Sequence, residues 1–266
     1  FLGMIWFHNN HIPYIAENQT RQDCADGKTC PKGDYSSAQL DYYGATVELD
    51  EQIGRIRRLL KTKGYADNTM IWFTSDNGPE GNCNDGNCEE VHYKSFPGSS
   101  KGLRGRKRDT WEGGHRVAGI IEWPAMIKKN RVVPNTPVNT IDFLPTVMDI
   151  LKVERPEDQK DWAMDGTSIM PLIRGEEFPD RGMGWWWHGR IGLGWRYGKW
   201  KLVNDSKSCV GDVCKPALYD LDADLAETTD ISLKYPVIFE QMKANLTEWV
   251  QSLYHSTKVE TKCPTA

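Results

Sequence analysis

The sequence lacks any apolar run that approaches the roughly 20 residues of a membrane-spanning helix, so it predicts no transmembrane segment. It also lacks a strong charge of either sign, because 33 lysines and arginines against 37 aspartates and glutamates give a formal net charge of −4. We therefore expect no general binding of nucleic acids or other polyanions, and any anion must be bound locally. Internal repeats and low-complexity tracts are absent, which excludes a repeat architecture. The composition is ordinary for a globular protein, 39% hydrophobic and 26% charged.

Cysteine is sparse, and six of the seven cysteines form close pairs along the chain. The pairs are Cys24 and Cys30, Cys83 and Cys88, and Cys209 and Cys214. Each pair brackets a turn sequence rich in glycine or aspartate, which is typical of short disulfide loops formed in an oxidising compartment. Zinc ligation is the alternative, although the spacing within the pairs is loose and His92 has no second histidine nearby to complete a ligand set.

Three Asn-x-Ser/Thr sequons, at Asn18, Asn204 and Asn245, also fit the secretory route. Together with the paired cysteines they predict a protein of the secretory pathway, either extracellular or lysosomal. Cys263 is left outside the pairs and could bond to another portion of the protein.

The spacing of apolar residues predicts the secondary structure of the first part of the chain. A long helix is expected over 37–63, because apolar residues recur near helical spacing and Gly64 follows the last turn. The apolar run 69–74 predicts a strand buried on both faces, and the alternation of strand, helix and strand favours an α/β architecture. Further strands are expected at 2–7 and 116–123, and a helix at 140–151.

The composition changes after about residue 154, which suggests a second part of the chain. Residues 154–182 are rich in Asp, Glu, Pro and Arg and are interpreted as a connecting segment. Residues 183–266 predict a small antiparallel sheet followed by an amphipathic helix with its apolar side chains on one face. The strands expected there are 183–188, 194–197, 200–203 and 217–221.

The stretch between residues 69 and 124 is the most informative. Its first strand ends in Ser-Asp-Asn-Gly at 75–78, which places a carboxylate beside a carboxamide where the strand emerges. The basic loop, residues 101–116, then carries a cluster of five cations at 101–108 and runs into Trp-Glu-Gly-Gly at 111–114. Two hard oxygen ligands near a cationic loop suit a divalent cation that holds an anionic substrate. Taken singly, the first motif is an ordinary turn and the second a solvated loop or a general polyanion patch.

The ordered set of motifs resembles the sulfatases of the alkaline-phosphatase superfamily. It comprises the Asp-Asn-Gly turn, Lys107 before the Trp-Glu-Gly-Gly motif, and Glu-Trp-Pro at 122–124. The opening Asn-His-Ile-Pro at 10–13 is similar to the family's Pro-His-x-Pro element, with asparagine in place of the first proline. The resemblance implies a partial alkaline-phosphatase-like α/β sheet covered by helices in residues 1–153, the C-terminal part of a sulfatase catalytic domain. Residues 183–266 would form a small C-terminal α+β subdomain.

The resemblance also implies the residues of an active site. Asp76 and Asn77 would bind one Ca²⁺ ion, whose loose coordination geometry tolerates mixed carboxylate and amide oxygens. Lys107 would be a catalytic residue that binds the substrate sulfate and stabilises charge on the transferring group. His11 would bind the sulfate or assist cleavage of the ester, and we prefer it to His8 because it directly precedes the x-Pro step.

The nucleophile that the resemblance implies is missing from this sequence. Sulfatases carry a Cys-x-Pro/Ser-x-Arg motif, whose cysteine is oxidised to formylglycine, and a pair of aspartates that completes the calcium site. None of the seven cysteines lies in such a motif. We therefore expect the chain to be the C-terminal part of a sulfatase, with the formylglycine on an N-terminal portion, either of the same chain or on a separate chain.

The tryptophan-rich stretch 185–190 bears on the substrate. Exposed rings could stack on sugar faces, and His188 or Arg190 could reach a sulfated glycan, although packing between subdomains is the more ordinary use of such rings. We interpret the chain as part of a sulfuric ester hydrolase that acts on a sulfated glycan or a small sulfate ester. The alternatives are a catalytically inactive relative with a binding or structural role, and a phosphodiesterase of the same superfamily, which six histidines disfavour.

Overall fold

The computed structural model describes residues 1–81, 97–133, 136–160, 162–187, 192–205, 209–210 and 213–260. The chain divides into two compact units, residues 1–125 and residues 126–266. The boundaries expected after residues 153 and 182 stay predictions. Within the described ranges, no helix is long and apolar enough to cross a bilayer.

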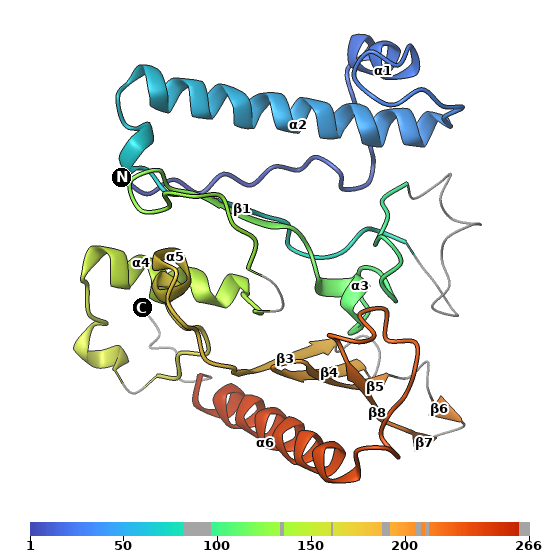
Figure 1. Ribbon diagram of the computed structural model, residues 1–266, viewed down its shortest axis with the longest axis vertical. Coiled ribbons are helices and arrows are strands. Elements are labelled where there is room, and N and C mark those ends of the chain that lie inside the picture. Colours follow the sequence, from blue (N-terminus) through green and yellow to red (C-terminus); the bar gives the residue numbers. More distant parts are fainter. Residues whose placement is uncertain are drawn as a thin grey trace. The chain divides into compact units, whose positions relative to one another are not determined.

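The first unit is built along α2 (Ser37–Thr62), which confirms the long helix expected from the sequence (Figure 1). A capping box starts this helix, because the Ser36 hydroxyl accepts from the Gln39 N–H and the Gln39 side chain accepts from the Ser36 N–H. It ends before Gly64, whose φ of +76° is a conformation that glycine adopts without steric cost.

The short helix α1 (Asn18–Ala25) leads into a loop that a disulfide between Cys24 and Cys30 closes. The disulfide expected for this first pair is confirmed, and zinc ligation by the pair is excluded. Cys83 and Cys88 lie outside the described residues. Cys209 and Cys214 stand opposite each other in the hairpin of β6 (Cys209–Val210) and β7 (Val213–Cys214).

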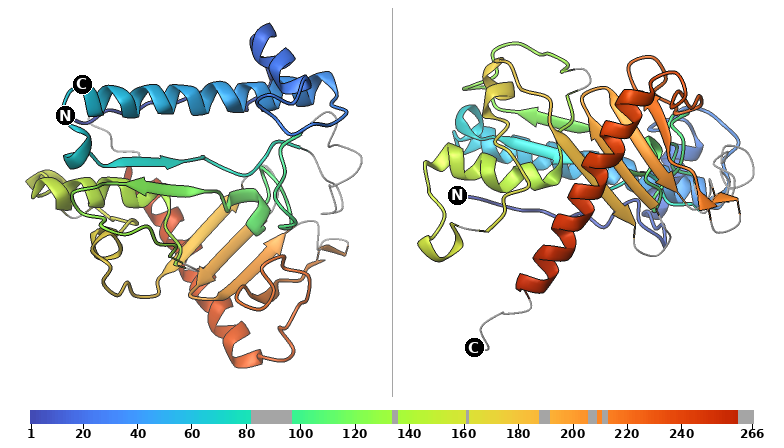
Figure 2. Two further views of the ribbon diagram at one scale, coloured as in Figure 1. Left: turned by 45° about the horizontal axis from the view of Figure 1, so that its top comes forward. Right: turned by 90° about the horizontal axis from the view of Figure 1, so that it is seen from below.

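A strand pair carries the central motifs of the first unit. After a 3₁₀ turn, η1 (Ala66–Asn68), the strand β1 (Ile71–Thr74) pairs antiparallel with β2 (Gly119–Glu122), as expected within the stretches 69–74 and 116–123. Helix α2 lies along this pair (Figures 1 and 2). Arg57 of α2 donates two hydrogen bonds to the Glu122 carboxylate, at 2.7 and 2.9 Å, which fixes the helix to the edge of the pair.

Two expectations for the first unit are wrong. β1 is half-buried rather than buried on both faces, because its sheet contains only two strands among the described residues. Residues 2–7 are not assigned as a strand there, and neighbouring side chains such as Phe1 and Trp6 are 95% and 85% exposed. A buried strand needs a neighbour at its edge and a layer on each face, and the described part of the chain supplies neither to this segment.

The second unit begins with short helical segments around a buried carboxylate. The elements are η2 (Thr140–Asp142), α4 (Phe143–Leu151), η3 (Glu157–Gln159) and α5 (Met170–Arg174), so the helix expected over 140–151 is confirmed. Asp142 is fully buried, accepts from the Thr167 N–H at 2.9 Å and forms an ion pair with Arg181. These partners compensate the cost of burying the Asp142 carboxylate.

The rest of the second unit is the predicted antiparallel sheet with a helix. Helix α6 (Pro236–Glu260) crosses the sheet (Figure 2), and its Met242 and Leu246 pack with Leu202 and Leu218 in the core. The strand order is β3 (Gly182–Trp187), β4 (Gly192–Tyr197), β5 (Trp200–Asp205), β8 (Ala217–Asp220).

The tryptophans of β3 lie in different environments. Trp185 lies against the fully buried Lys201, with 4.9 Å from the ammonium to the ring centroid. Trp186 packs on Tyr254 of α6 at 5.6 Å, yet Trp186 and Trp187 remain 37% and 39% exposed. His188 and Arg190, expected to bind substrate, lie outside the described residues.

Candidate functional site

The turn after β1 presents the side chains expected to bind a cation. Asp76 is exposed, and among the described residues its carboxylate has no hydrogen-bond or ion-pair partner. Asn77 is held by its own turn, because its Nδ2 donates to the Gly78 carbonyl at 2.8 Å while the Ser75 hydroxyl donates to the Asn77 carbonyl at 3.1 Å. The exposed carboxylate and the remaining carboxamide oxygen are donors of the kind that Ca²⁺ takes.

These two residues do not complete a metal site. Within the described ranges, no group of three or more His, Cys, Asp and Glu side chains could hold a metal ion. Ca²⁺ takes about six to eight oxygen ligands, so Asp76 and Asn77 fit part of its coordination shell and the others must come from elsewhere.

Backbone contacts dock the basic loop directly onto this turn. The Gly78 N–H donates to the Gly114 carbonyl at 2.9 Å, and a Cβ on Gly78 would lie 1.9 Å from the Gly113 oxygen. Gly113 is enclosed in turn, since its Cβ would lie 2.2 Å from the Gly105 oxygen. The glycines therefore allow two backbone segments to touch, which places the cations beside the Asp-Asn turn.

The closeness of these backbones predicts a large effect of Gly113→Ala. The added methyl group must displace the Gly105 carbonyl, so we expect a loss of about 1–3 kcal/mol in the free energy of unfolding, as for overpacked cores. Gly119→Ala is the matched control, because no atom lies within 4 Å of its Cβ position. Urea unfolding of both variants checks this, and equal stability would contradict the docking.

The five clustered cations at 101–108 in the basic loop have different environments, so the loop is not a uniformly solvated patch. Lys101 is exposed, whereas the Arg104 guanidinium stacks on the buried Trp111 ring at 3.6 Å. Arg106 is only 3% exposed, and burial lowers the pKa of its guanidinium. It donates to the Glu80 carbonyl at 3.0 Å from Nε and 2.7 Å from Nη2, and also to the Gly98 carbonyl.

Glu112 supports the basic loop. It lies in α3 (Glu112–His115) and its side chain is 1% exposed. Arg116 donates to one carboxylate oxygen at 2.7 Å, and His115 Nε2 lies 3.7 Å from the other. A buried carboxylate with these partners holds the two ends of the helix turn together.

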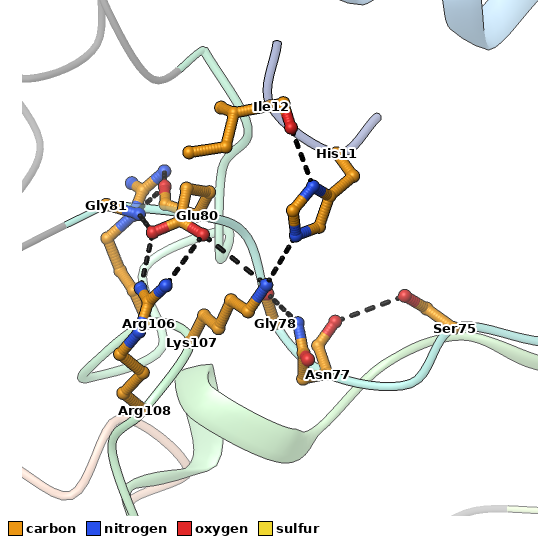
Figure 3. Close-up of polar contacts among 10 residues, drawn as sticks. All are labelled: His11, Ile12, Ser75, Asn77, Gly78, Glu80, Gly81, Arg106, Lys107 and Arg108. Atoms are coloured by element: carbon orange, nitrogen blue, oxygen red, sulfur yellow. Dashed lines mark hydrogen bonds and ion pairs between the residues drawn. The ribbon is translucent and has the colours of Figure 1, made fainter. Parts of the chain in front are cut away.

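His11 and Lys107 meet, although 96 residues separate them in the sequence. The Lys107 Nζ lies 3.1 Å from the His11 Nε2 (Figure 3). His11 is carried by a segment tied to α2, since the Asn10 side chain donates to the Tyr42 carbonyl at 3.0 Å and to the Thr46 hydroxyl at 2.7 Å. The φ of Asn10 is +67°, a conformation that proline cannot adopt.

The contacts of His11 assign its tautomer. Its Nδ1 lies 2.8 Å from the Ile12 carbonyl, which can only accept, so Nδ1 carries the hydrogen. A lysine ammonium can only donate, so Nε2 accepts from Lys107 as the unprotonated nitrogen of a neutral ring. Nε2 is therefore the ring position that is able to take a proton.

Glu80 belongs to this site, although the sequence motifs assign it no role. Its carboxylate is paired with Arg108 and lies 3.4 Å from the Lys107 Nζ. Burial raises the pKa of Glu80, but the hydrogen bonds from Arg108 and the Gly81 N–H, with the charges of Arg108 and Lys107, outweigh that effect and leave the pKa lowered. The sequence signal that could have identified Glu80 is an acidic residue two positions after Asp-Asn-Gly, in a chain that also carries a dense basic loop.

Tyr14 borders the site, and its environment predicts that the stability of the folded state depends on alkaline pH. Burial, with smaller contributions from Tyr42 and Glu80 and an opposing one from Arg106, raises the pKa of Tyr14 to about 12. Its hydroxyl has no hydrogen-bond partner in the described structure. Since the unfolded phenol ionises near 10.0, the folded state loses stability as the pH rises from there through about 12. Tyr14→Phe keeps the ring contact with Tyr42 and removes this loss.

The alkaline prediction is checked by measuring the free energy of unfolding from pH 8 to 12 for the wild type and Tyr14→Phe. We expect the variant to be at least as stable at pH 8 and to lose less stability above pH 10. Tyr65→Phe, at an exposed tyrosine, is the control. Parallel curves for the wild type and Tyr14→Phe would contradict the buried, unpartnered hydroxyl.

Several known proteins are similar to this chain in sequence. The family model described as Sulfatase matches residues 1–153. Human steryl-sulfatase is 37% identical over 142 residues, 52% of this chain and 22% of that protein. The N-acetylgalactosamine-6-O-sulfatase of Bacteroides thetaiotaomicron is 28% identical over 206 residues, 74% of this chain and 39% of that protein.

Solved structures show the same fold. The structure of Ps i-CgsB in complex with k-i-k-neocarrahexaose superposes with a TM-score of 0.70 at 23% identity, over 90% of this chain and 47% of that chain. The expected α/β architecture with a small C-terminal α+β part is thereby confirmed. The chain spans less than half the length of each of these three relatives.

Proposed function

The chain belongs to the sulfatase family, and we propose that it forms part of a sulfuric ester hydrolase that cleaves sulfate monoesters. The contact of 3.1 Å between the Lys107 ammonium and the His11 imidazole, beside the Asp-Asn turn, carries this proposal. A fixed cation next to a neutral imidazole is an arrangement that can hold an anionic group and move a proton at the same place.

Lys107 and His11 have separate tasks in this proposal. The Lys107 ammonium binds a sulfate oxygen and stabilises the charge that develops as the S–O bond cleaves. His11 Nε2, unprotonated in the resting site, takes a proton from solvent and then donates it in a hydrogen bond to the sulfate or passes it to the leaving oxygen. Nδ1 is hydrogen-bonded to the Ile12 carbonyl, so the ring keeps its orientation while Nε2 gains and loses a proton.

Asp76 and Asn77 would hold one Ca²⁺ ion through carboxylate and carboxamide oxygens. When bound, the ion supplies Lewis-acid neutralisation of charge on the sulfate. The exposed carboxylate of Asp76, which has no partner among the described residues, and the fixed turn of Asn77 support this assignment.

The nucleophile must lie elsewhere, because none of the seven cysteines sits in a Cys-x-Pro/Ser-x-Arg motif. We place the formylglycine on an N-terminal portion of the same protein, or on a separate chain. The disulfide between Cys24 and Cys30 supports passage through the secretory pathway, to an extracellular or lysosomal location.

The substrate class follows from the relatives and the exposed rings of β3. The name of one relative, N-acetylgalactosamine-6-O-sulfatase, specifies a sulfated sugar. Trp186 and Trp187 remain partly exposed and offer faces on which a sugar could stack. We therefore propose a sulfated glycan as substrate, with a small sulfate ester as the alternative, and keep His188 and Arg190 as proposed contacts.

The experiment that tests this function compares an aryl sulfate with the matching aryl phosphate diester, using the native protein supplied with Ca²⁺. We expect release of inorganic sulfate and no cleavage of the phosphate diester. Cleavage of the diester alone would identify a phosphodiesterase. Turnover of neither compound, by native protein that contains the formylglycine, would identify an inactive relative with a binding or structural role.

A further inference from the structure

Glu80 is the acidic member of a row of four side chains, Arg108, Glu80, Lys107 and His11 (Figure 3). Arg108 donates to both carboxylate oxygens of Glu80, with Nη2 3.2 Å from Oε2. The Lys107 Nζ lies 3.4 Å from Glu80 Oε2 and 3.1 Å from His11 Nε2. The carboxylate therefore contacts the cation that the proposed function directs at the sulfate.

The surrounding backbone holds Glu80 rigidly. Its side chain is 9% exposed, and the Gly81 N–H donates to Oε1 at 3.2 Å. The buried Arg106 binds the Glu80 carbonyl twice, and the Lys107 N–H donates to the Pro79 carbonyl at 3.0 Å. Residues 79–81 and 106–108 are thus joined through main chain and side chain, so little conformational entropy is lost when the ion pair forms.

The donors of Lys107 can be counted. An ammonium has three N–H groups. One contacts His11 Nε2, and the Glu80 carboxylate lies 3.4 Å from Nζ as an ion-pair partner. These two partners limit the orientations of the ammonium and leave N–H capacity for an oxygen of a bound anion.

An ordinary surface ion pair is the competing explanation, and such pairs contribute little to stability. Two observations disfavour it. The Glu80 and Lys107 side chains are only 9% and 19% exposed. Arg108, which holds the far side of the carboxylate, has a φ of +77°, a strained conformation for a residue other than glycine. Such strain persists where the surrounding structure requires it, often at functional sites.

We propose that Glu80 is a positioning residue, which aims the Lys107 ammonium at the substrate sulfate and keeps it in contact with His11. This inference rests on the proposed function of Lys107 as the sulfate-binding cation. Loss of the carboxylate would leave Lys107 charged but free to turn, so the sulfate would still bind while its alignment in the transition state is lost.

Glu80→Gln tests the proposal, because it removes the charge and keeps the size of the side chain. In the native protein with its formylglycine, we expect kcat for an aryl sulfate to fall on the order of 10- to 100-fold, with little change in KM. Since Glu80 acts through Lys107, the double variant Glu80→Gln/Lys107→Ala should be no slower than Lys107→Ala alone. Additive losses, or an unchanged kcat in Glu80→Gln, would overturn the proposal.

Glu122→Gln is the matched control. It also removes a carboxylate that binds an arginine through two hydrogen bonds in the same unit, but it contacts Arg57 of α2. We expect wild-type kcat and KM from this variant. A loss equal to that of Glu80→Gln would assign the effect to general destabilisation and overturn the positioning role.

A second measurement does not depend on turnover and separates the two proposals. The rate at which an amine-acylating reagent modifies Lys107, followed by peptide mass spectrometry, should rise in Glu80→Gln and stay unchanged in Glu122→Gln. If the wild type hydrolyses no sulfate ester while this difference is found, the proposed function fails and the coupling of Glu80 to Lys107 stands. Equal rates in all three proteins would overturn the coupling itself.

Discussion

Lys107→Ala is expected to lower kcat/KM for a sulfate monoester by about 100- to 1,000-fold, the usual cost of removing one preorganised donor from an active site. The expectation follows from its position. Lys107 is held between the Glu80 carboxylate and His11 Nε2, so its ammonium is already oriented and little reorganisation is needed when the substrate binds. The measurement is the initial rate of sulfate release by the native protein and by the variant, at equal formylglycine content.

The control for this variant is Lys101→Ala, at an exposed lysine of the same basic loop. If the loop acted only through its overall positive charge, the two variants would lose the same amount of activity. We expect Lys101→Ala to retain wild-type kcat/KM. Equal losses, or full activity in Lys107→Ala, would contradict the assigned role.

Asp76→Ala is expected to abolish the dependence of activity on Ca²⁺ and to lower kcat/KM by at least about 100-fold, because the ion contributes several kcal/mol to transition-state stabilisation. Stability should be nearly unchanged, since the Asp76 carboxylate has no ion-pair or hydrogen-bond partner among the described residues. Ca²⁺ titration of activity, paired with thermal unfolding in excess chelator, separates the two effects.

Asp67→Ala is the matched control for the cation site, because Asp67 is also an exposed aspartate of the first unit. Its activity should respond to Ca²⁺ as the wild type does. An Asp76→Ala protein that keeps the wild-type Ca²⁺ response would remove Asp76 from the metal site. A large loss of stability in chelator would show that the carboxylate has a structural role instead.

The elements that local spacing determines were predicted well from the sequence. The helix expected over 37–63 is α2, and the strands around 69–74 and 116–123 pair as β1 and β2. These segments carry strong periodic or continuous apolar patterns and clear end signals. The segment 2–7 has a similar pattern but is not assigned as a strand in the described structure, because an apolar run predicts burial and does not supply the partner that buries it.

The candidate site was predicted in part. His11 and Lys107 were selected by motif order, and the structure brings them into contact. Glu80 and Arg106 were missed because their roles depend on how two distant segments dock, through the glycines of the turn and the loop. Local sequence does not encode such docking, so a charged residue beside a motif remains ambiguous until its partners are placed.

The most direct measurement is peptide mass spectrometry of the native protein, before and after reduction. If this chain supplies the sulfate-binding part of a sulfatase site, a co-purifying peptide should carry formylglycine within a Cys-x-Pro/Ser-x-Arg motif that residues 1–266 lack. Native, correctly folded material in which no peptide contains that motif, or in which its cysteine position holds a residue that cannot be oxidised to formylglycine, would contradict the assignment as an active sulfatase.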